Sequence, residues 1–137
     1  MQKKILVFAG FSGAIAILLG AMAAHVLKSK LNTGTVTILD LEVFETAARY
    51  QMYHSIALLA ITFLMDKSHI NFLKKACYCF MIGIVLFSGS LYLLATANII
   101  GLHNIQWLGP RSPVGGLFLI AGWLLIAVAG LKKSTPN

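Results

Sequence analysis

The feature that most constrains this chain is a series of four long apolar runs, at residues 5–27, 47–65, 76–100 and 114–131. A helix of about 20 mostly apolar residues crosses a hydrocarbon core of about 30 Å. Only 11% of the 137 residues are charged, against roughly 25% in soluble domains, so a soluble fold could not cover its own surface. We therefore predict an all-α integral membrane protein that spans the membrane four times as a single transmembrane domain.

The first run shares two features with a secretory signal peptide. Lys3 and Lys4 precede it, and Ala21-Met22-Ala23 has the small-x-small form of a cleavage site. However, the apolar stretch from residue 5 to residue 20 is longer than the usual apolar region of a signal peptide. We therefore expect this run to be retained as the first span.

The segment before the second run has the pattern of an amphipathic helix. From residue 40 onward, apolar residues recur at helical spacing while charged residues occupy another face. We predict an amphipathic helix between spans one and two that runs into span two. Its apolar face comprises Leu41, Phe44, Ala48 and Met52, and its charged face comprises Glu42, Glu45 and Arg49.

Small residues in the spans favour close approach of the helices. Helices associate in lipid through packing rather than through the hydrophobic effect, so small side chains mark the expected contacts. We predict a compact four-helix bundle with little room for a wide pore. The expected packing positions are Ser12, Ala16 and Gly20 in span one, Gly83 and Gly89 in span three, and Gly115, Gly116 and Gly122 in span four.

The distribution of lysine and arginine predicts the orientation of the chain. Cytoplasmic connections carry an excess of these residues. An orientation with both termini in the cytoplasm places seven of them inside and four outside, and we predict that orientation. The inside set is Lys3, Lys4, Lys67, Lys74, Lys75, Lys132 and Lys133, and the outside set is Lys28, Lys30, Arg49 and Arg111.

Polar residues gather in the outer half of the predicted bundle. An ionisable residue at membrane depth normally faces the bundle interior and finds a partner. We expect Glu45 and Arg49 to pair, and to share one network with His25 and His54. The network either fixes helix packing or forms a ligand or proton site; a metal site at the two histidines lacks a clear third ligand, and we predict none. The full cluster is His25, Glu45, Arg49, Gln51, Tyr53, His54, Ser88, Ser90 and Tyr92.

The sequence contains no pattern that predicts catalysis or a cofactor. We find no nucleophile triad, no Gly-rich phosphate loop and no metalloprotease motif. Lysine pairs at the edges of apolar runs are typical of a membrane surface and not of nucleic-acid binding. We therefore predict a protein that is not an enzyme, holds no cofactor, binds no nucleic acid and has the lipid bilayer as its main partner.

Four segments carry a resemblance to a known family. They are residues 20–25 (GAMAAH), 49–54 (RYQMYH), 87–92 (FSGSLY) and 113–116 (PVGG), the last followed by Gly122 and Trp123. In the order and spacing of these segments, the chain resembles a bacterial family of small multi-span membrane proteins, which is catalogued as domain of unknown function 423 (UPF0382-like). The resemblance implies a four-helix protein of the bacterial cytoplasmic membrane, and it implies no activity.

The sequence leaves two classes of function open. The first is a structural or accessory component of the cytoplasmic membrane or of a larger membrane complex, favoured by the tight helices and the lack of a catalytic pattern. The alternative is an oligomeric transporter, channel or small-ligand binder that uses the outer polar cluster. Four short helices in one copy can hardly enclose a path, so that alternative requires a homo-oligomer.

Overall fold

The computed structural model of the chain describes residues 1–65, 70–102 and 111–131, and within these ranges it contains helices and no strand. This confirms the all-α fold class. Two short π-helical segments, η1 and η2, interrupt two of the long helices. The elements are α1 (Gln2–Met22), η1 (Ala23–Leu27), α2 (Lys28–Asn32), α3 (Ile38–Leu64), α4 (Ile70–Gly83), η2 (Ile84–Ser88), α5 (Gly89–Thr96) and α6 (Arg111–Leu131).

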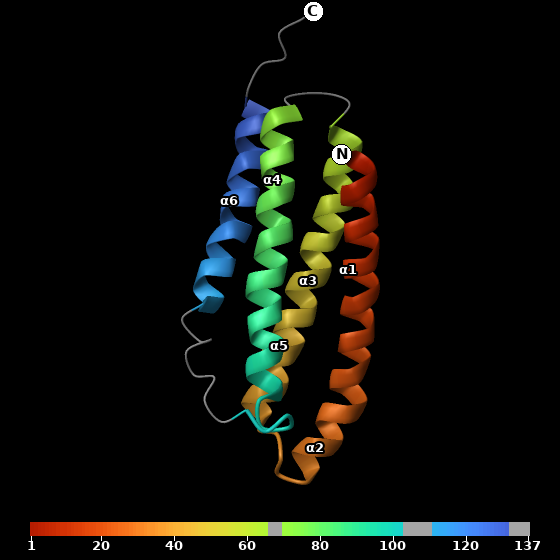
Figure 1. The fold of residues 1–137 in the computed structure, drawn as a ribbon, viewed down its shortest axis with the longest axis vertical. Coiled ribbons are helices and arrows are strands. Elements are labelled where there is room, and N and C mark those ends of the chain that lie inside the picture. Colours follow the sequence, from red (N-terminus) through yellow and green to blue (C-terminus); the bar gives the residue numbers. More distant parts are fainter. Residues whose placement is uncertain (66–69, 103–110, 132–137) are drawn as a thin grey trace, which may run out of the picture.

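The long helical segments run up and down in a bundle (Figure 1). The segment α1 to α2 packs against α3, the continuous segment α4, η2 and α5 packs against α3 on one side, and α6 packs against α4 and η2. The order across the molecule is therefore α1, α3, α4 with α5, then α6, as Figure 1 shows. The start of α1 and the end of α6 lie at the same end of the bundle.

Three of the described helical segments are long and apolar enough to cross a membrane: Gln2–Asn32, Asn71–Thr96 and Pro113–Leu131. The helix α3 is not among them, because polar side chains such as Arg49, Gln51 and His54 interrupt its apolar residues. Nevertheless, its 27 residues reach about 40 Å at the helical rise, which exceeds a hydrocarbon core of about 30 Å. Its role as a span stays a prediction.

The helix α3 begins at a capping box that holds its first turn. The Thr37 hydroxyl oxygen accepts a hydrogen bond from the Asp40 backbone N–H at 3.1 Å, and Asp40 Oδ2 accepts one from the Thr37 N–H at 2.9 Å. These bonds satisfy backbone donors that a helix start otherwise leaves unpaired. As expected, the amphipathic segment continues without a break, and it forms the first part of α3.

The core consists of two apolar clusters separated by a polar layer. One cluster, toward the start of α1, includes Ile5, Leu58 and Phe80, and the other, toward α2, includes Leu27 and Phe44. The two clusters lie at opposite ends of α3, and the middle of that helix carries buried Gln51, His54 and Ser55 instead. The candidate site therefore lies midway along α3.

Glycines form the closest contacts between α6 and its neighbour. A Cβ added to Gly115 would lie 2.7 Å from Phe87 Cα, and one added to Gly83 would lie 2.8 Å from Leu119 Cγ. A Cβ on Gly122 would overlap the ring of Phe80. These glycines let α6 approach α4 and η2 at a distance that a side chain would prevent.

The other small residues behave differently from one another. Ser12 and Ala16 are buried, whereas Gly116 makes an ordinary contact, 3.7 Å from its Cβ position to Phe87. Nothing lies within 4 Å of the Cβ positions of Gly20 and Gly89. The expectation that these two glycines mark close helix contacts is therefore wrong, because no neighbouring helix comes within contact distance of their Cβ positions.

Candidate functional site

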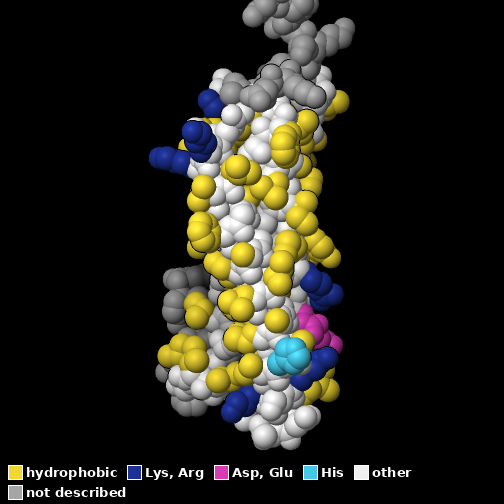
Figure 2. All heavy atoms as spheres, turned by 90° about the vertical axis from the view of Figure 1, so that its right-hand side faces the viewer, with side chains coloured by type: hydrophobic (Ala, Val, Ile, Leu, Met, Phe, Trp, Pro, Cys, Tyr) yellow, Lys and Arg dark blue, Asp and Glu magenta, His cyan; other side chains and the backbone are white. Residues whose placement is uncertain are grey.

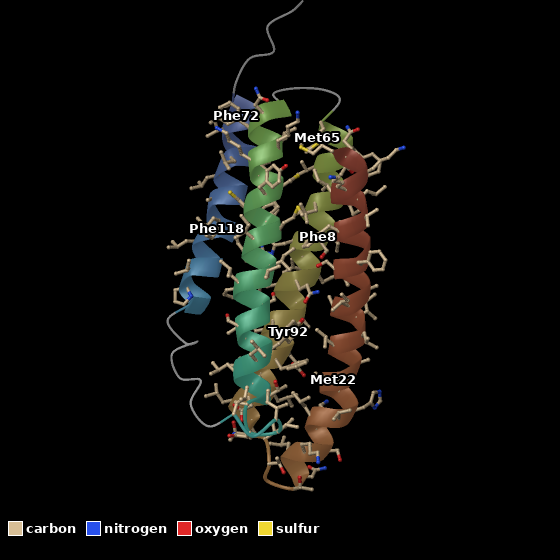
Figure 3. All side chains as sticks on the ribbon, viewed as in Figure 1. Phe8, Met22, Met65, Phe72, Tyr92 and Phe118 are labelled. Carbon is tan, nitrogen blue, oxygen red and sulfur yellow. The ribbon has the colours of Figure 1, made fainter. Side chains whose placement is uncertain are left out.

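The candidate site centres on Gln51, whose side chain joins three helical segments. Its Nε2 donates a hydrogen bond of 2.9 Å to the Ser12 carbonyl oxygen on α1, and its Oε1 accepts one of 2.9 Å from the Tyr92 hydroxyl on α5. Tyr92 projects from α5 where that helix lies beside α3 (Figure 3), and its ring packs on Phe44 with centroids 4.7 Å apart. One amide thus ties α1, α3 and α5 together.

Two serines extend this network. Ser55 Oγ lies 2.8 Å from Ser12 Oγ and 2.7 Å from the Gln51 carbonyl oxygen, one turn earlier on α3. Both serines are buried. Because a hydroxyl is small, the serine pair lets α1 and α3 lie close together while satisfying the polar atoms of both side chains.

His54 forms a second polar contact, toward α6. Its Nδ1 lies 2.7 Å from the Tyr50 carbonyl oxygen, and the Trp123 indole Nε1 donates to its Nε2 at 3.2 Å. A carbonyl only accepts and an indole N–H only donates. The imidazole must therefore be neutral, with its proton on Nδ1.

Aromatic rings enclose this histidine. Phe80 and Trp123 contact it with centroids 5.1 and 6.1 Å away, and they contact each other at 5.3 Å. Tyr50 stacks on it at 6.1 Å. The rings make edge and offset contacts of the kind that stabilise aromatic clusters. Both nitrogens of the imidazole are already occupied, so this arrangement leaves no free lone pair for a substrate or a metal.

The structure does not bring the charged residues into this network. His25, Arg49 and Tyr53 are exposed, and the Arg49 guanidinium donates to Thr46 Oγ1 at 3.3 Å. Within the described residues, no hydrogen bond or ion pair joins Arg49 to Glu45, or either of them to His25 or His54. The single network expected from the sequence is therefore wrong, and His25 and Arg49 lie on the bundle surface.

The two serines near η2 have separate environments. Ser90 Oγ donates to the Phe87 carbonyl oxygen at 2.9 Å and stays within its own helix. Ser88 is 1% exposed, and no hydrogen bond to its Oγ is found among the described residues. Ser88 lies at the last position of η2. The wider π-helical turn changes which backbone carbonyl lies within reach of a serine hydroxyl.

Sequence reasoning missed three participants in the site. Ser12 was expected only as a packing residue, and neither Ser55 nor Trp123 was assigned to the cluster. Ser55 could have been found, because it lies four residues after Gln51 and so shares its helix face. Trp123 could not, since no pattern in the sequence sets the rotation of α6 about its axis.

The arrangement is suited to holding helices together. The buried amide and imidazole and the half-buried phenol are hydrogen-bonded within the protein. No three histidine, cysteine, aspartate or glutamate side chains gather as a metal site in the described part of the chain. Three of the four segments that carry the family resemblance meet here through Gln51, Tyr92 and Gly115.

Comparison with known proteins agrees with that resemblance. A family model described as "Protein of unknown function (DUF423)" matches residues 19–116. The UPF0382 membrane protein YwdK of Bacillus subtilis is 36% identical over 132 residues, which cover 96% of this chain and 98% of that protein. The UPF0382 inner membrane protein YgdD of Escherichia coli is 33% identical over 131 residues, covering 96% and 92%.

A relative from Haemophilus influenzae, also named UPF0382 membrane protein, is 34% identical over 137 residues and covers 98% of this chain and 99% of its own. No solved structure matches this chain. The family model covers more than half of the chain and the relatives cover nearly all of it. The chain therefore belongs to the DUF423 family, whose members named here are bacterial membrane proteins with no assigned activity.

Proposed function

We propose that this protein is a structural or accessory component of the bacterial cytoplasmic membrane, that it is not an enzyme, and that it crosses the membrane four times with both termini in the cytoplasm. The observation that supports this proposal best is the set of hydrogen bonds that Gln51, Ser55 and His54 make within the protein. Gln51, Ser55 and His54 each hydrogen-bond to a neighbouring helix, as expected of residues that fix a fold. A site for a polar substrate would keep such groups free.

The outward surface supports an accessory role within the bilayer. Large apolar side chains such as Phe11, Leu18, Phe63 and Leu117 are each at least 65% exposed. A soluble protein rarely exposes so much apolar surface, whereas a membrane protein presents it to lipid or to other membrane proteins. This surface can contact a larger membrane complex or a second copy of the chain.

A complementation experiment tests the structural role. We expect deletion of the gene to increase uptake of an impermeant dye after osmotic stress, and we expect the double variant Gln51→Leu with Tyr92→Phe to restore the barrier in proportion to its folded amount. The variant removes the side-chain hydrogen bonds of Gln51 but replaces both Gln51 and Tyr92 by apolar groups of similar shape, which is far less costly than removing one partner. Protein level is measured by immunoblot and dye uptake by flow cytometry.

Two results would contradict this role. The first is a deletion strain with the same dye uptake as its parent. The second is a double variant that reaches the wild-type level in the membrane yet gives no protection, because Gln51 or Tyr92 would then act on a ligand and not on the fold.

The proposed orientation is tested by cysteine labelling in intact cells. In a background of Cys77→Ala and Cys79→Ala, we expect an impermeant maleimide to label Asn32→Cys and to leave Gln2→Cys and Ser134→Cys unlabelled. Gln2 and Asn32 lie at opposite ends of the helical segment 2–32. Permeabilised cells, in which all three positions should react, serve as the control. Labelling of Gln2→Cys with protection of Asn32→Cys would reverse the orientation.

A further inference from the structure

A groove runs along α1 where this helix faces α4, η2 and α5. One hollow of about 530 Å³ is lined by Lys3, Lys4, Val7, Phe8, Phe11 and Met81. A second hollow of about 320 Å³ shares Phe8 and Phe11 with the first and continues past Ile15 to Gly89 and Tyr92. Because the two hollows share these rings, they form one groove that follows α1.

The groove changes character along its length. Its first part has two lysines at the rim, and both are exposed at the start of α1. Its second part is almost wholly apolar, and the buried Gln51 at its floor is already bonded to Tyr92 and Ser12. From Phe8 to Leu19 the groove covers about 17 Å at the helical rise, close to half of a hydrocarbon core of about 30 Å. That is the depth reached by one acyl chain of one leaflet.

Positive charge gathers at the mouth of this groove. The hydroxyl of Tyr78 on α4 lies 3.8 Å from Met1 Sδ, which brings that face of α4 beside the start of α1. Lys75, one turn before Tyr78, is exposed at the same end. The first turn of α1 contains no acidic residue, and Met1 provides no side-chain cap, so the positive end of the helix dipole adds to these charges.

Negative charge lies at the opposite end among the described residues. Asp40, Glu42 and Glu45 belong to the first part of α3, far from the start of α1 (Figure 1). On the face shown in Figure 2, lysine and arginine side chains occur toward both ends of the apolar belt, whereas acidic side chains occur only toward the lower end. The fourth acidic residue, Asp66, lies outside the described residues, as do Lys67, Lys132 and Lys133.

We propose that this groove binds one anionic phospholipid of the surrounding bilayer. Its phosphate lies beside Lys3 and Lys4, and one acyl chain follows Phe8 and Phe11 toward Gly89. Ammonium groups attract anionic headgroups, and an apolar channel of this depth is complementary to a hydrocarbon chain. This inference goes beyond the proposed function, and it holds whichever side of the membrane the termini occupy.

The charge requirement is tested with purified protein in mild detergent. We expect native mass spectrometry to show one retained phosphatidylglycerol per chain and little phosphatidylcholine with the same acyl chains. The double variant Lys3→Gln with Lys4→Gln should bind phosphatidylglycerol about 30-fold more weakly, the effect of two lysines beside an anionic headgroup. The matched control is Lys28→Gln with Lys30→Gln, which removes the same charge at the other end of the same helical segment and should leave binding unchanged.

The acyl-chain requirement is tested at Gly89. Nothing lies within 4 Å of its Cβ position, so Gly89→Leu places a side chain in the groove without disturbing the fold. We expect this variant to unfold at the temperature of the lipid-free wild type, but to lose the rise in melting temperature that bound phosphatidylglycerol gives by mass action. Gly130→Leu on α6, where the Cβ position is equally open, is the control and should keep that rise.

Three outcomes would overturn the proposal. Equal retention of both lipids by the wild type would mean that no anionic site exists. Unchanged phosphatidylglycerol binding in Gly89→Leu would place the lipid elsewhere on the protein. A chain dimer that holds no lipid and is lost in Gly89→Leu would mean that a second copy occupies the groove.

Discussion

Replacing Gly115 by alanine is expected to destabilise the bundle by about 1–3 kcal/mol, the range for overpacking a closely packed contact. The added methyl group would meet the backbone of Phe87, 2.7 Å from its Cα. A backbone cannot turn aside as the end of a flexible side chain can, so α6 would have to move away from η2. Thermal unfolding of the purified protein in detergent, followed by near-ultraviolet circular dichroism, measures the loss.

The same substitution at Gly89 and at Gly20 gives a matched control. Both Cβ positions are open, and alanine in a helix interior is favoured over glycine by roughly 0.5–1 kcal/mol. These two variants should therefore match or exceed the wild type in melting temperature. If all three alanine variants unfolded at the same temperature, the close contact between α6 and η2 would not exist in the membrane protein.

Gln51→Leu is expected to cost about 1–3 kcal/mol, the range for leaving a buried polar group without its partner. The substitution removes the hydrogen bond to Ser12 and leaves the Tyr92 hydroxyl unpaired between α3 and α5. Adding Tyr92→Phe removes that unpaired group, so the double variant should lose less stability than the two single variants added together. Unfolding in detergent, measured for all four proteins, gives the coupling energy.

Arg49→Gln is the control for this cycle. The residue lies two positions from Gln51 but is exposed, and among the described residues its side chain hydrogen-bonds to Thr46 alone. Its loss should change stability by less than about 0.5 kcal/mol, as is usual at a surface position. Additive effects of Gln51→Leu and Tyr92→Phe, or a large effect of Arg49→Gln, would show that the helices are held together by a different set of polar contacts.

The class of fold could be predicted from sequence because apolar runs and helical spacing are local properties. The continuous α3 follows from Leu41, Phe44 and Ala48, which recur on one helix face and are buried in the structure. The π-helical segments could not be predicted. Neither segment 23–27 nor segment 84–88 differs in composition from the α-helix around it. The wider turn depends instead on how the two flanking parts of the helix pack.

The candidate site was only partly predictable, because membrane depth can be read from sequence but the rotation of a helix cannot. Gln51 and Arg49 share nearly the same depth. Side chains two positions apart on a helix, however, point about 200° away from each other, so Gln51 is buried and Arg49 is exposed. The same holds for glycines. Gly115 meets a backbone while the adjacent Gly116 makes an ordinary contact, and no property of the two residues in the sequence separates them.

The π-helical segment η2 makes chain length, as well as residue identity, a constraint on this fold. It lies between Gly83, which contacts α6, and Tyr92, which bonds to Gln51 on α3. Removing one residue between those two anchors would turn everything beyond it by about 100° about the helix axis. Tyr92 would then point away from Gln51 even though every side chain in both contacts was unchanged. This stretch should therefore accept substitutions more readily than insertions or deletions.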